Sequence, residues 1–474
     1  MRKGMKISMT RKIQAGILTL LLISVSGRNL RGQALPSHPL SLGEAIDYAL
    51  AHYPAVRAAM EQVESARNGV ALARTSYLPQ ANPIYQANRA TQNQVTGIWL
   101  PSSITPSVEG PVQPNSATSF WDAQAGALLS WEPVDFGLRH AEVEQARSVE
   151  RKSDADVELT RLQLASAVGG YFLNAVAAQQ TVLAAQAEVK RWQVFDNVVR
   201  VLVRQELRPG VDGSRADAEL AMARTQLFQA QAAEQQAEAI LASLMGTAGE
   251  SIQVEAHPLL GSPPASALPP AAPAGHPLAR DQQASVEELR ARERVIDHTD
   301  YPRFFVQAEA FARGSGANPD GAYAGGLKGL GLERGNWVAG ISVVFPNLFD
   351  FSARRDEKRM AEAQERSQEA RYQQTLQDLT GQAAAAQAAY QAAARIAQNT
   401  PIALEAARQA ESQARVRYQS GLTNLVEVAE GESLLAQAER DDAVARIGVW
   451  RGLFGVAVAQ GNLESFRAVL KAVD

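Results

Sequence analysis

The chain has 474 residues, a formal net charge of −4, no cysteine and only 6% aromatic residues. The missing cysteines exclude disulfides, thiolate metal sites and a thiol nucleophile within this sequence, and the acidic balance argues against a nucleic-acid partner. Few aromatic residues beside abundant Ala and Gln are typical of long helices rather than of several globular domains.

Residues 1–34 are predicted to be a secretory signal peptide. Basic residues at the start precede the apolar run Ile17–Val25, and Gly32-Gln33-Ala34 supplies a small-residue cleavage site. The run is too short to span a bilayer, which argues against the alternative of an uncleaved membrane anchor. No later stretch is long and apolar enough for a transmembrane helix, so a membrane-embedded form of this exported chain would have to be a closed β-barrel.

A first repeat is predicted over residues 35–248. Ser41 and Glu44 form a capping-box pattern at the start of its first helix. Helical periodicity then stops, and two segments on either side of a Pro-rich loop are predicted to be strands. A helical tract of some 70 residues follows, which at 1.5 Å per residue reaches about 100 Å. In chain order, the predicted elements are a helix at Ser41–Ser76, strands at about 82–97 and 119–131, a helix at Leu138–Leu207 and a returning helix to about Met245.

The second repeat, predicted over residues 280–462, has the same order. A Pro-rich linker at 249–279 separates it from the first repeat, and residues 463–474 are predicted to be a C-terminal tail. Alternation with a period of two marks its strands. The predicted elements are a helix at Leu278–Asp297, strands at about 303–313 and 337–345, a helix at Ser352–Ser420 and a last helix to about Gln460.

Two stretches of the chain, Val203–Leu227 and Arg415–Glu439, are similar to each other. Each has a basic helix end, a glycine (Gly210 or Gly421) and then an acid-rich helix start. Gly ends a helix in a left-handed conformation at little steric cost, and acids suit the positive end of the next helix. Both stretches are therefore predicted to be tips of helical hairpins, which makes the chain a duplicated unit.

The predicted fold class is mainly α with a β-barrel portion, built from a duplicated unit of helix, strand, strand, long helix and helix. Four strands cannot close a transmembrane barrel, because the smallest barrels have eight. Three chains would supply twelve, so a symmetric homotrimer with a 12-stranded transmembrane barrel is the simplest closure. The long helices would continue that barrel as an α-helical coiled-coil tube.

The chain resembles the TolC-type outer-membrane efflux proteins, also called outer membrane factors, over nearly its whole length after the signal peptide. The resemblance is carried by Arg417-Tyr418-x-x-Gly421, followed by Leu425-Val426-Glu427-Val428 and Leu434-Leu435-Ala436-Gln437, and by the Pro-flanked joints after each strand pair. The first tip departs from the family pattern, because it has Leu207-Arg208-Pro209-Gly210-Val211-Asp212-Gly213 in place of the Arg-Tyr-x-x-Gly form.

The resemblance implies a passive channel, without catalysis or cofactor, that reaches from the outer membrane of a Gram-negative bacterium into the periplasm. It implies a homotrimer whose tube narrows at the helix tips and opens when a periplasmic adaptor (membrane fusion) protein docks there. An inner-membrane pump of the RND, ABC or MFS type would supply the energy, in a tripartite efflux or type I secretion system. The implied partners are thus adaptor, pump, two sibling chains and outer-membrane lipid, with no nucleic acid.

Acidic residues at the second tip are the first candidate site. Glu427 and Glu430 are spaced i, i+3 and share a helix face, at positions where the family pattern carries acids that ring the pore. Three chains would surround one constriction with these carboxylates, and such a ring attracts cations and retards anions. The alternative is that both acids only favour the start of a helix.

Gate contacts are expected at the same tips. Asp212, Asp217 and Glu219 of the first tip are expected either to line the opening or to bond to Arg417 and Tyr418 across the hairpins and hold the opening shut. A solvated charged surface is the alternative.

A tip surface that faces the adaptor is expected at Gly210 and Val211 and at Gly421 and Leu422. The alternative for these residues is ordinary packing of the tips.

Aromatic residues gather in the predicted strand regions. Trp99, Trp121 and Trp337 are expected at the membrane interfaces, where barrels carry aromatic girdles. For Trp131 and Phe345, packing at the joint between sheet and helices is an equal alternative.

Two other classes of protein are weighed against a channel. An exported structural coiled-coil envelope protein without channel activity would explain the long helices, but not strand pairs at matching places in both repeats. An enzyme is disfavoured, because Gly329-x-Gly331 lacks the following helix start of a dinucleotide site and the six His show no metal-ligand spacing. The pattern does not indicate the cargo, whether drug, metal ion, solvent or protein.

Overall fold

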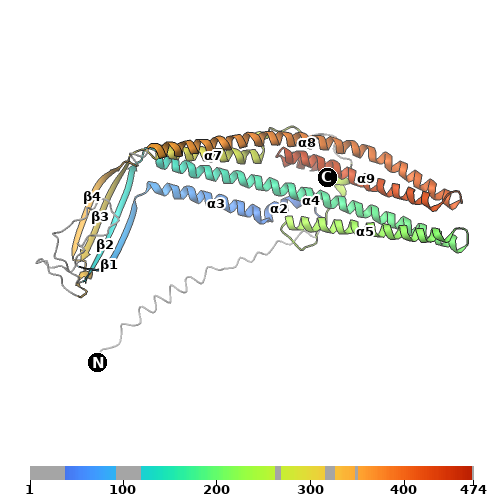
Figure 1. Ribbon diagram of the computed structural model, residues 1–474, viewed down its shortest axis with the longest axis horizontal. Helices are drawn as coiled ribbons and strands as arrows, with labels where there is room; N and C mark the ends of the chain where they lie inside the picture. The colour runs from blue at the N-terminus through green and yellow to red at the C-terminus, as the bar shows by residue number, and fades with distance from the viewer. Residues whose placement is uncertain (1–37, 92–118, 262–267, 315–325, 347–350, 472–474) are drawn as a thin grey trace, which may run out of the picture. The chain divides into compact units, whose positions relative to one another are not determined.

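The computed structural model describes residues 38–91, 119–261, 268–314, 326–346 and 351–471. Leu40–Asp474 form one compact unit, which contains all the described helices and strands labelled in Figure 1. The predicted signal peptide at residues 1–34 lies outside the described residues.

Four strands form one antiparallel sheet in the order β1-β2-β3-β4. Each half of the chain supplies one hairpin, and the pairing of β2 with β3 joins the two halves. The four predicted strands are confirmed with shifts of a few residues at their ends, while predicted strand residues 92–97 lie outside the described part. The strands are β1 (Gln80–Thr91), β2 (Ser119–Val134), β3 (Arg303–Gly314) and β4 (Arg334–Val344).

The register gives this sheet two chemically different faces. One, called the apolar face, has alanines between its larger side chains, which are Tyr85, Trp121, Leu129, Trp131, Phe304, Val306, Trp337, Ile341 and Val343, with Arg89 opposite Trp121 as its charged residue. The other, called the polar face, carries most of the polar side chains, which are Asn82, Gln86, Asn88, Asp122, Gln124, Ser130, Gln307, Glu309, Arg313, Arg334, Asn336 and Ser342, together with the apolar Ile84, Leu128, Phe305, Phe311 and Val338. Most large side chains of the apolar face are exposed, whereas Gln124 and Glu309 of the polar face are buried. This is the reverse of a water-soluble antiparallel sheet, which buries its apolar face.

Two helices precede the sheet where one was predicted. The predicted helix Ser41–Ser76 is instead divided into α2 (Leu42–His52) and α3 (Pro54–Arg74), with a short 3₁₀ turn at Thr75–Tyr77. Pro54 lacks an N–H and forces the residue before it out of the helical region, so Tyr53 is extended at φ −68° and ψ 129°. The predicted capping box of Ser41 and Glu44 is confirmed.

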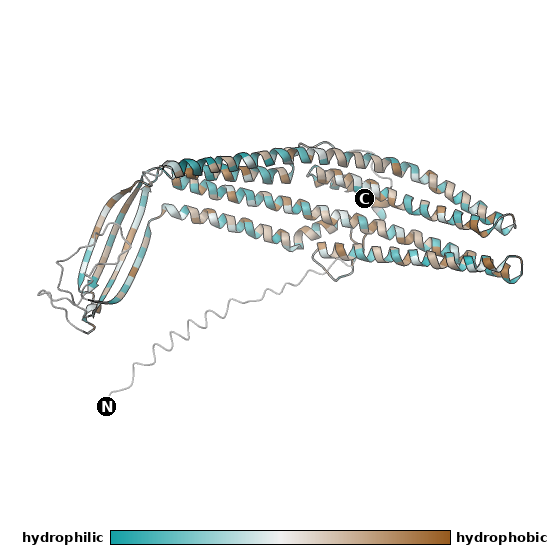
Figure 2. Ribbon diagram, in the orientation of Figure 1, coloured by the Kyte–Doolittle hydropathy of each residue, from teal (hydrophilic) through white to brown (hydrophobic). Residues whose placement is uncertain are grey.

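Long helices make up most of the structure. They are α4 (Leu138–Arg204), α5 (Gly210–Leu244), α7 (Pro277–His298), α8 (Phe351–Gln419) and α9 (Leu425–Ala459), each within about three residues of its predicted bounds. In Figure 1, α4 returns as α5 and α8 returns as α9, so each half ends in a helical hairpin. At 67 residues, α4 extends about 100 Å. Figure 2 shows apolar residues spread along these helices, and none of the described helices is long and apolar enough to cross a membrane.

The predicted linker and tail both contain structure. The linker includes α6 (His257–Leu260), a 3₁₀ turn at Pro273–Gly275 and a single bridge between Leu40 and Val254. Residues of the predicted C-terminal tail form α10 (Leu463–Lys471). Phe466 of α10 is buried edge-to-face against Trp450 and Phe454 of α9, which explains why this segment is ordered as a helix.

Candidate functional site at the hairpin tips

The two hairpin tips have the same backbone hydrogen bonds but different residues in the left-handed position. At the second tip, Gly421 has φ +78° and the Leu422 N–H donates to the Arg417 carbonyl at 2.9 Å. At the first tip, the left-handed residue is Glu206, with φ +55°, and the Leu207 N–H donates to the Leu202 carbonyl at 2.9 Å. Both are Schellman turns, in which these bonds satisfy the last carbonyls of the helix.

The predicted role of Gly210 as the helix-ending residue is therefore wrong, while that of Gly421 is confirmed. Gly210 is the first residue of α5, directly after Pro209, whose extended backbone (φ −61°, ψ 147°) starts the new helix. Equivalent positions of the two tips are separated by the same number of residues: Glu206 corresponds to Gly421, and Leu207 to Leu422. Asp212 corresponds in the same way to Glu427, and each is the third residue of its helix. Matching the two glycines in the sequence instead pairs Gly210 with Gly421. That match is wrong because the left-handed position of the first tip is held by Glu206, a residue that has a Cβ.

Tyr418 of the second tip is held by two residues of the first. Its hydroxyl donates to Asp212 Oδ2 at 2.9 Å, and the guanidinium of Arg208 lies over its ring at 4.2 Å. Arg208 also donates to the Tyr418 carbonyl and to the Thr423 carbonyl, the latter at 3.3 Å. The predicted contact between Asp212 and Tyr418 is thus present in the single chain, whereas Arg208 was not singled out from the sequence because its partners lie in the other repeat.

The Tyr418 side chain is fully buried in the core beneath the tips. Phe195 of α4 packs against its ring at 5.5 Å between centroids, and Leu425 and Val428 of α9 belong to the same cluster. Burial, followed by the hydrogen bond to the negatively charged Asp212, raises the pKa of the Tyr418 phenol. The phenol therefore remains a hydrogen-bond donor at any physiological pH.

The other predicted gate residues make different contacts. Arg417 lies 3.7 Å from Glu427 within its own hairpin and has no contact with Asp212 in the single chain. Asp217 pairs with Arg200 of α4, and no described residue of the second tip forms a hydrogen bond or ion pair with it. A place at the edge of the opening and a solvated charged surface both stay predictions for Asp217.

The two predicted pore acids differ in their surroundings. Glu427 accepts a hydrogen bond from Thr423 and pairs with Arg417, while the Asn424 side chain caps the start of α9 by accepting from the Val426 N–H at 3.0 Å. Glu430 is exposed, and no described residue forms an ion pair with it. Glu430 is therefore the acid of the pair whose charge is least neutralised.

The expected adaptor-facing surface is open at both tips. Val211 and Leu422 are among the exposed large apolar side chains, and a Cβ added to Gly210 or Gly421 would meet nothing within 4 Å. Leu207, the structural counterpart of Leu422, is equally exposed and was missed from the sequence. Contact of these residues with an adaptor stays a prediction.

A buried ionic cluster lies behind the tips and ties the two hairpins together. Arg191 of α4 pairs with Glu432 and Glu439 of α9, each at 3.0 Å, and Arg440 of α9 pairs with Glu188 of α4 at 3.0 Å. Arg415 of α8 joins the same fully buried Glu432. Burial raises the pKa of Glu188 despite the neighbouring arginines. Sequence reasoning missed this cluster, since its members belong to different repeats.

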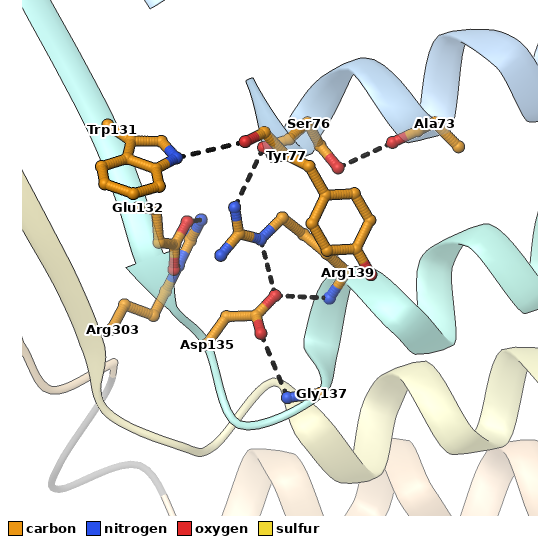
Figure 3. Close-up of polar contacts among 9 residues, drawn as sticks. All are labelled: Ala73, Ser76, Tyr77, Trp131, Glu132, Asp135, Gly137, Arg139 and Arg303. Carbon is orange, nitrogen blue, oxygen red and sulfur yellow. Dashed lines mark hydrogen bonds and ion pairs between the residues drawn. The ribbon is translucent and has the colours of Figure 1, made fainter. Parts of the chain in front are cut away.

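Figure 3 shows a second polar cluster where the sheet meets the helices. Arg139, nearly buried at the start of α4, donates to Asp135 at 2.7 Å and to the Ser76 carbonyl at 3.1 Å. Asp135 also accepts the backbone N–H groups of Gly137 and Arg139. Burial alone would raise the pKa of Asp135, but the hydrogen bonds from Arg139 and the backbone outweigh it and lower the pKa. These bonds fix the turn from β2 into α4.

The predicted interface aromatics are distributed over the sheet. Trp121 lies opposite Arg89, whose guanidinium is 5.9 Å from its ring, and Trp337 is 80% exposed on the apolar face. Trp131 donates its indole N–H to the Tyr77 carbonyl at 3.1 Å, which places it at the joint of Figure 3. Trp99 lies outside the described residues.

A family model described as outer membrane efflux protein matches residues 45–247 and 268–447. Among curated proteins, Protein CyaE of Bordetella pertussis is 30% identical over 212 residues, which are 44% of this chain and 40% of that protein, so the match spans less than half of the relative. Among solved structures, CusC superposes with a TM-score of 0.72 at 16% identity, over 89% of this chain and 92% of that one. VceC of Vibrio cholerae gives 0.69 at 17%, over 89% and 96%. At these identities the likeness to both structures concerns the fold.

Proposed function

The chain belongs to the outer membrane efflux protein family, and on that premise we propose that it is a channel of the outer membrane through which solutes leave the periplasm. The observation that carries the proposal is the reversed sheet, with its apolar face exposed and its polar face sheltered, at one end of hairpins about 100 Å long. A barrel wall has this pattern, because lipid covers one face and water the other.

Closure of the barrel requires other chains. The edge strands β1 and β4 of the four-stranded sheet are available to pair with siblings, and an unpaired edge is not tolerated in a bilayer. Three copies joined from β4 to β1 give twelve strands, and their hairpins then surround one helical tube. The fold is shared with CusC, whose structure is described as that of a transmembrane channel, and this supports a channel as the product of such closure.

The hairpin tips form the periplasmic end of the proposed tube and its gate. Glu430, together with the partly neutralised Glu427, supplies the acids of a constriction that prefers cations. The bond of Tyr418 to Asp212 holds the second hairpin against the first and keeps that constriction narrow.

Opening is proposed to come from a periplasmic adaptor that docks at the exposed tip residues Val211 and Leu422. Solute transfer through the open channel is passive, with an inner-membrane pump supplying the energy. Leu207, which is exposed at the first tip as Leu422 is at the second, is added to the proposed docking surface.

The test is reconstitution of the purified mature chain into planar lipid bilayers, with its mass in detergent measured in parallel. A trimer that conducts ions in discrete steps supports the proposal. A monomer that is soluble without detergent and gives no conductance would overturn it and would favour the structural coiled-coil alternative.

A further inference from the structure

Four polar residues lie in one row across the polar face of the sheet. The row is near the ends of β2, β3 and β4 at Ser119, Gly314 and Arg334, and Figure 1 shows these strand ends away from the helices. Gln86 of β1 is opposite Gln124 of β2, Gln124 is opposite Arg313 of β3, and Arg313 is opposite Arg334 of β4. Arg313 is the last residue but one of β3 and Arg334 the first of β4. The row therefore brings two cations and two amides together at one end of the sheet.

The two arginines repel each other as the row stands. Like charges directly opposite on neighbouring strands destabilise their pairing. Among the described residues, no carboxylate forms an ion pair with Arg313 or Arg334, and neither guanidinium donates a hydrogen bond. Asp122, the neighbouring carboxylate on the polar face, accepts from Asn88 at 3.2 Å instead. Neither arginine is thus held in an ion pair within the described part of the chain, although Asp122 and the buried Glu309 lie on the same face of the sheet.

Gln124, beside Arg313, adds a second and independent observation. Its side chain is only 3% exposed, and its Nε2 is buried without a hydrogen-bond partner in the described structure. Its Oε1 accepts from Gln86 Nε2 at 3.5 Å. A buried amide N–H₂ group without an acceptor is costly. Exchanging the amide oxygen and nitrogen of Gln86 or Gln124 would still leave the row with more donors than acceptors, because the guanidinium groups of Arg313 and Arg334 carry five N–H groups each.

We propose that the row of Gln124, Arg313 and Arg334 binds an oxyanion, a carboxylate or a phosphate group carried by a solute. Guanidinium forks match the geometry of both groups, and charge-assisted hydrogen bonds to them are among the strong ones. A bound oxyanion would separate the two positive charges and supply the acceptor that the Gln124 amide lacks.

The location of this site in a lumen rests on the proposed function, whereas the row itself lies within one chain. In a closed trimer, the polar face lines the pore, and each chain contributes two arginines to a ring near its outer end. That ring is opposite in sign to the Glu427 and Glu430 carboxylates at the tips. The channel would then admit cations preferentially at one end and hold anionic groups at the other.

Binding is tested on the purified full chain in detergent micelles, with inorganic phosphate and acetate as separate probes that distinguish the two oxyanions. Titration calorimetry is expected to show saturable binding of at least one probe. Arg313→Gln and Arg334→Gln should each weaken it about ten-fold or more, as expected for loss of a charge-assisted contact. The matched control is Arg89→Gln, which lies near the same end of the sheet on the apolar face and should bind like the wild type. Equal binding by all variants, or no saturable binding by the wild type, overturns the proposal.

Thermal unfolding separates a binding site from a structural one. Without the anion, Arg334→Gln should unfold at the same temperature as the wild type or higher, because it removes a repulsion. Phosphate or acetate should raise the wild-type midpoint and leave that of Arg334→Gln unchanged. A destabilised Arg334→Gln with no anion effect on the wild type would assign the row a structural role only. If the chain conducts in bilayers but binds neither probe, the oxyanion site is overturned and the proposed channel stands. If the chain binds a probe but never conducts, the proposed channel is overturned and the oxyanion site stands.

Discussion

Tyr418 shows how one residue can connect the two repeats. Its hydroxyl reaches Asp212 of the first tip, its ring lies under Arg208, and its carbonyl accepts from the same arginine. The ring itself is buried against Phe195, independently of the bond that the hydroxyl makes. Loss of the hydroxyl alone should therefore loosen the tips without unfolding the core.

Tyr418→Phe is expected to shift the tips toward the open state. A hydrogen bond to a charged partner contributes about 1.5–3 kcal/mol, so the ratio of open to closed channels should rise about ten-fold or more. Single-channel recording measures that ratio, and Asp212→Asn should show the same change. Tyr171→Phe, a partly exposed tyrosine of α4, is the control that should leave it unaltered. If Tyr418→Phe and Asp212→Asn both conduct like the wild type, the bond does not hold the gate.

Glu430→Gln is expected to reduce cation selectivity more than Glu427→Gln does. Glu427 already shares its charge with Arg417 and a hydroxyl donor, whereas Glu430 is exposed without an ion pair among the described residues. Reversal potentials in a salt gradient give the ratio of cation to anion permeability. This ratio should fall roughly several-fold in the double variant. Glu464→Gln, an exposed acid on α10, is the control. An unchanged reversal potential in the double variant would remove the acidic ring from the mechanism.

At the scale of elements, helix ends and joints determine where the tips and the sheet lie. The first tip ends on a non-glycine left-handed residue and the second on Gly421, yet both turns have the same hydrogen bonds. The joint of Figure 3 uses buried charge instead, with Arg139 and Asp135 linking α4 to the end of α3.

Gly421→Ala and Gly210→Ala form a matched pair at the two tips. Gly421 has φ +78°, where a Cβ costs about 1 kcal/mol, so its substitution should destabilise the chain by about that amount. Gly210 lies in the first turn of α5 with an ordinary backbone, so Ala there should be neutral or stabilising by up to about 1 kcal/mol. Thermal unfolding in detergent compares the two. Equal effects at both positions would contradict the observed difference in backbone conformation.

Arg139→Gln should be strongly destabilising because it leaves Asp135 buried without its partner. Breaking a buried ion pair by removing one member costs about 3 kcal/mol or more. Arg67→Gln, which breaks a more exposed pair with Glu150, should cost at most about 1 kcal/mol. Similar unfolding midpoints for the two variants would show that the joint is not held by this pair.

The same joint should depend on pH in a defined direction. The folded-state pKa of Asp135 lies below its ordinary value of 3.8, so the stability that Asp135 contributes is fully present above that value. It is lost as the pH falls through the lowered pKa. The difference between wild type and Asp135→Asn in unfolding midpoint should therefore be constant at neutral pH and shrink in strongly acidic buffer. A difference that grows on acidification would contradict the assigned shift.

At the scale of the whole molecule, the sheet is the part that a single chain leaves incomplete. Its apolar face is exposed, its edges are unpaired with one another, and the polar face is sheltered. A bilayer on one side and sibling strands at both edges resolve all three features together.

Trp337→Lys tests which face meets lipid. Trp337 is 80% exposed on the apolar face, and a lysine on a lipid-facing strand costs about 2–4 kcal/mol near the bilayer centre. The folded fraction recovered in lipid vesicles should fall accordingly. Asn336→Lys, the preceding residue on the polar face, should insert normally. If Asn336→Lys is the variant that fails to insert, the assignment of the two faces is reversed.

The sequence by itself determined the helices, the four strands, the duplication and the second tip, because periodicity, capping residues and glycine act within a few residues of each other. It missed the break at Pro54 and the ordered α10, and it assigned the left-handed residue of the first tip to Gly210 instead of Glu206. The family resemblance supplied Tyr418 and Asp212 as gate candidates, and the structure brought them together.

Only the tertiary structure decided which distant residues meet. Arg208 over Tyr418, the cluster around Glu432 and the row of Gln124, Arg313 and Arg334 each join segments that are far apart in sequence. A shift of one residue in strand register would move Arg313 to the apolar face and dissolve the row, and nothing local to β3 encodes that choice. Register and helix pairing are set by burial summed over whole elements, so these sites appear only once the chain has folded.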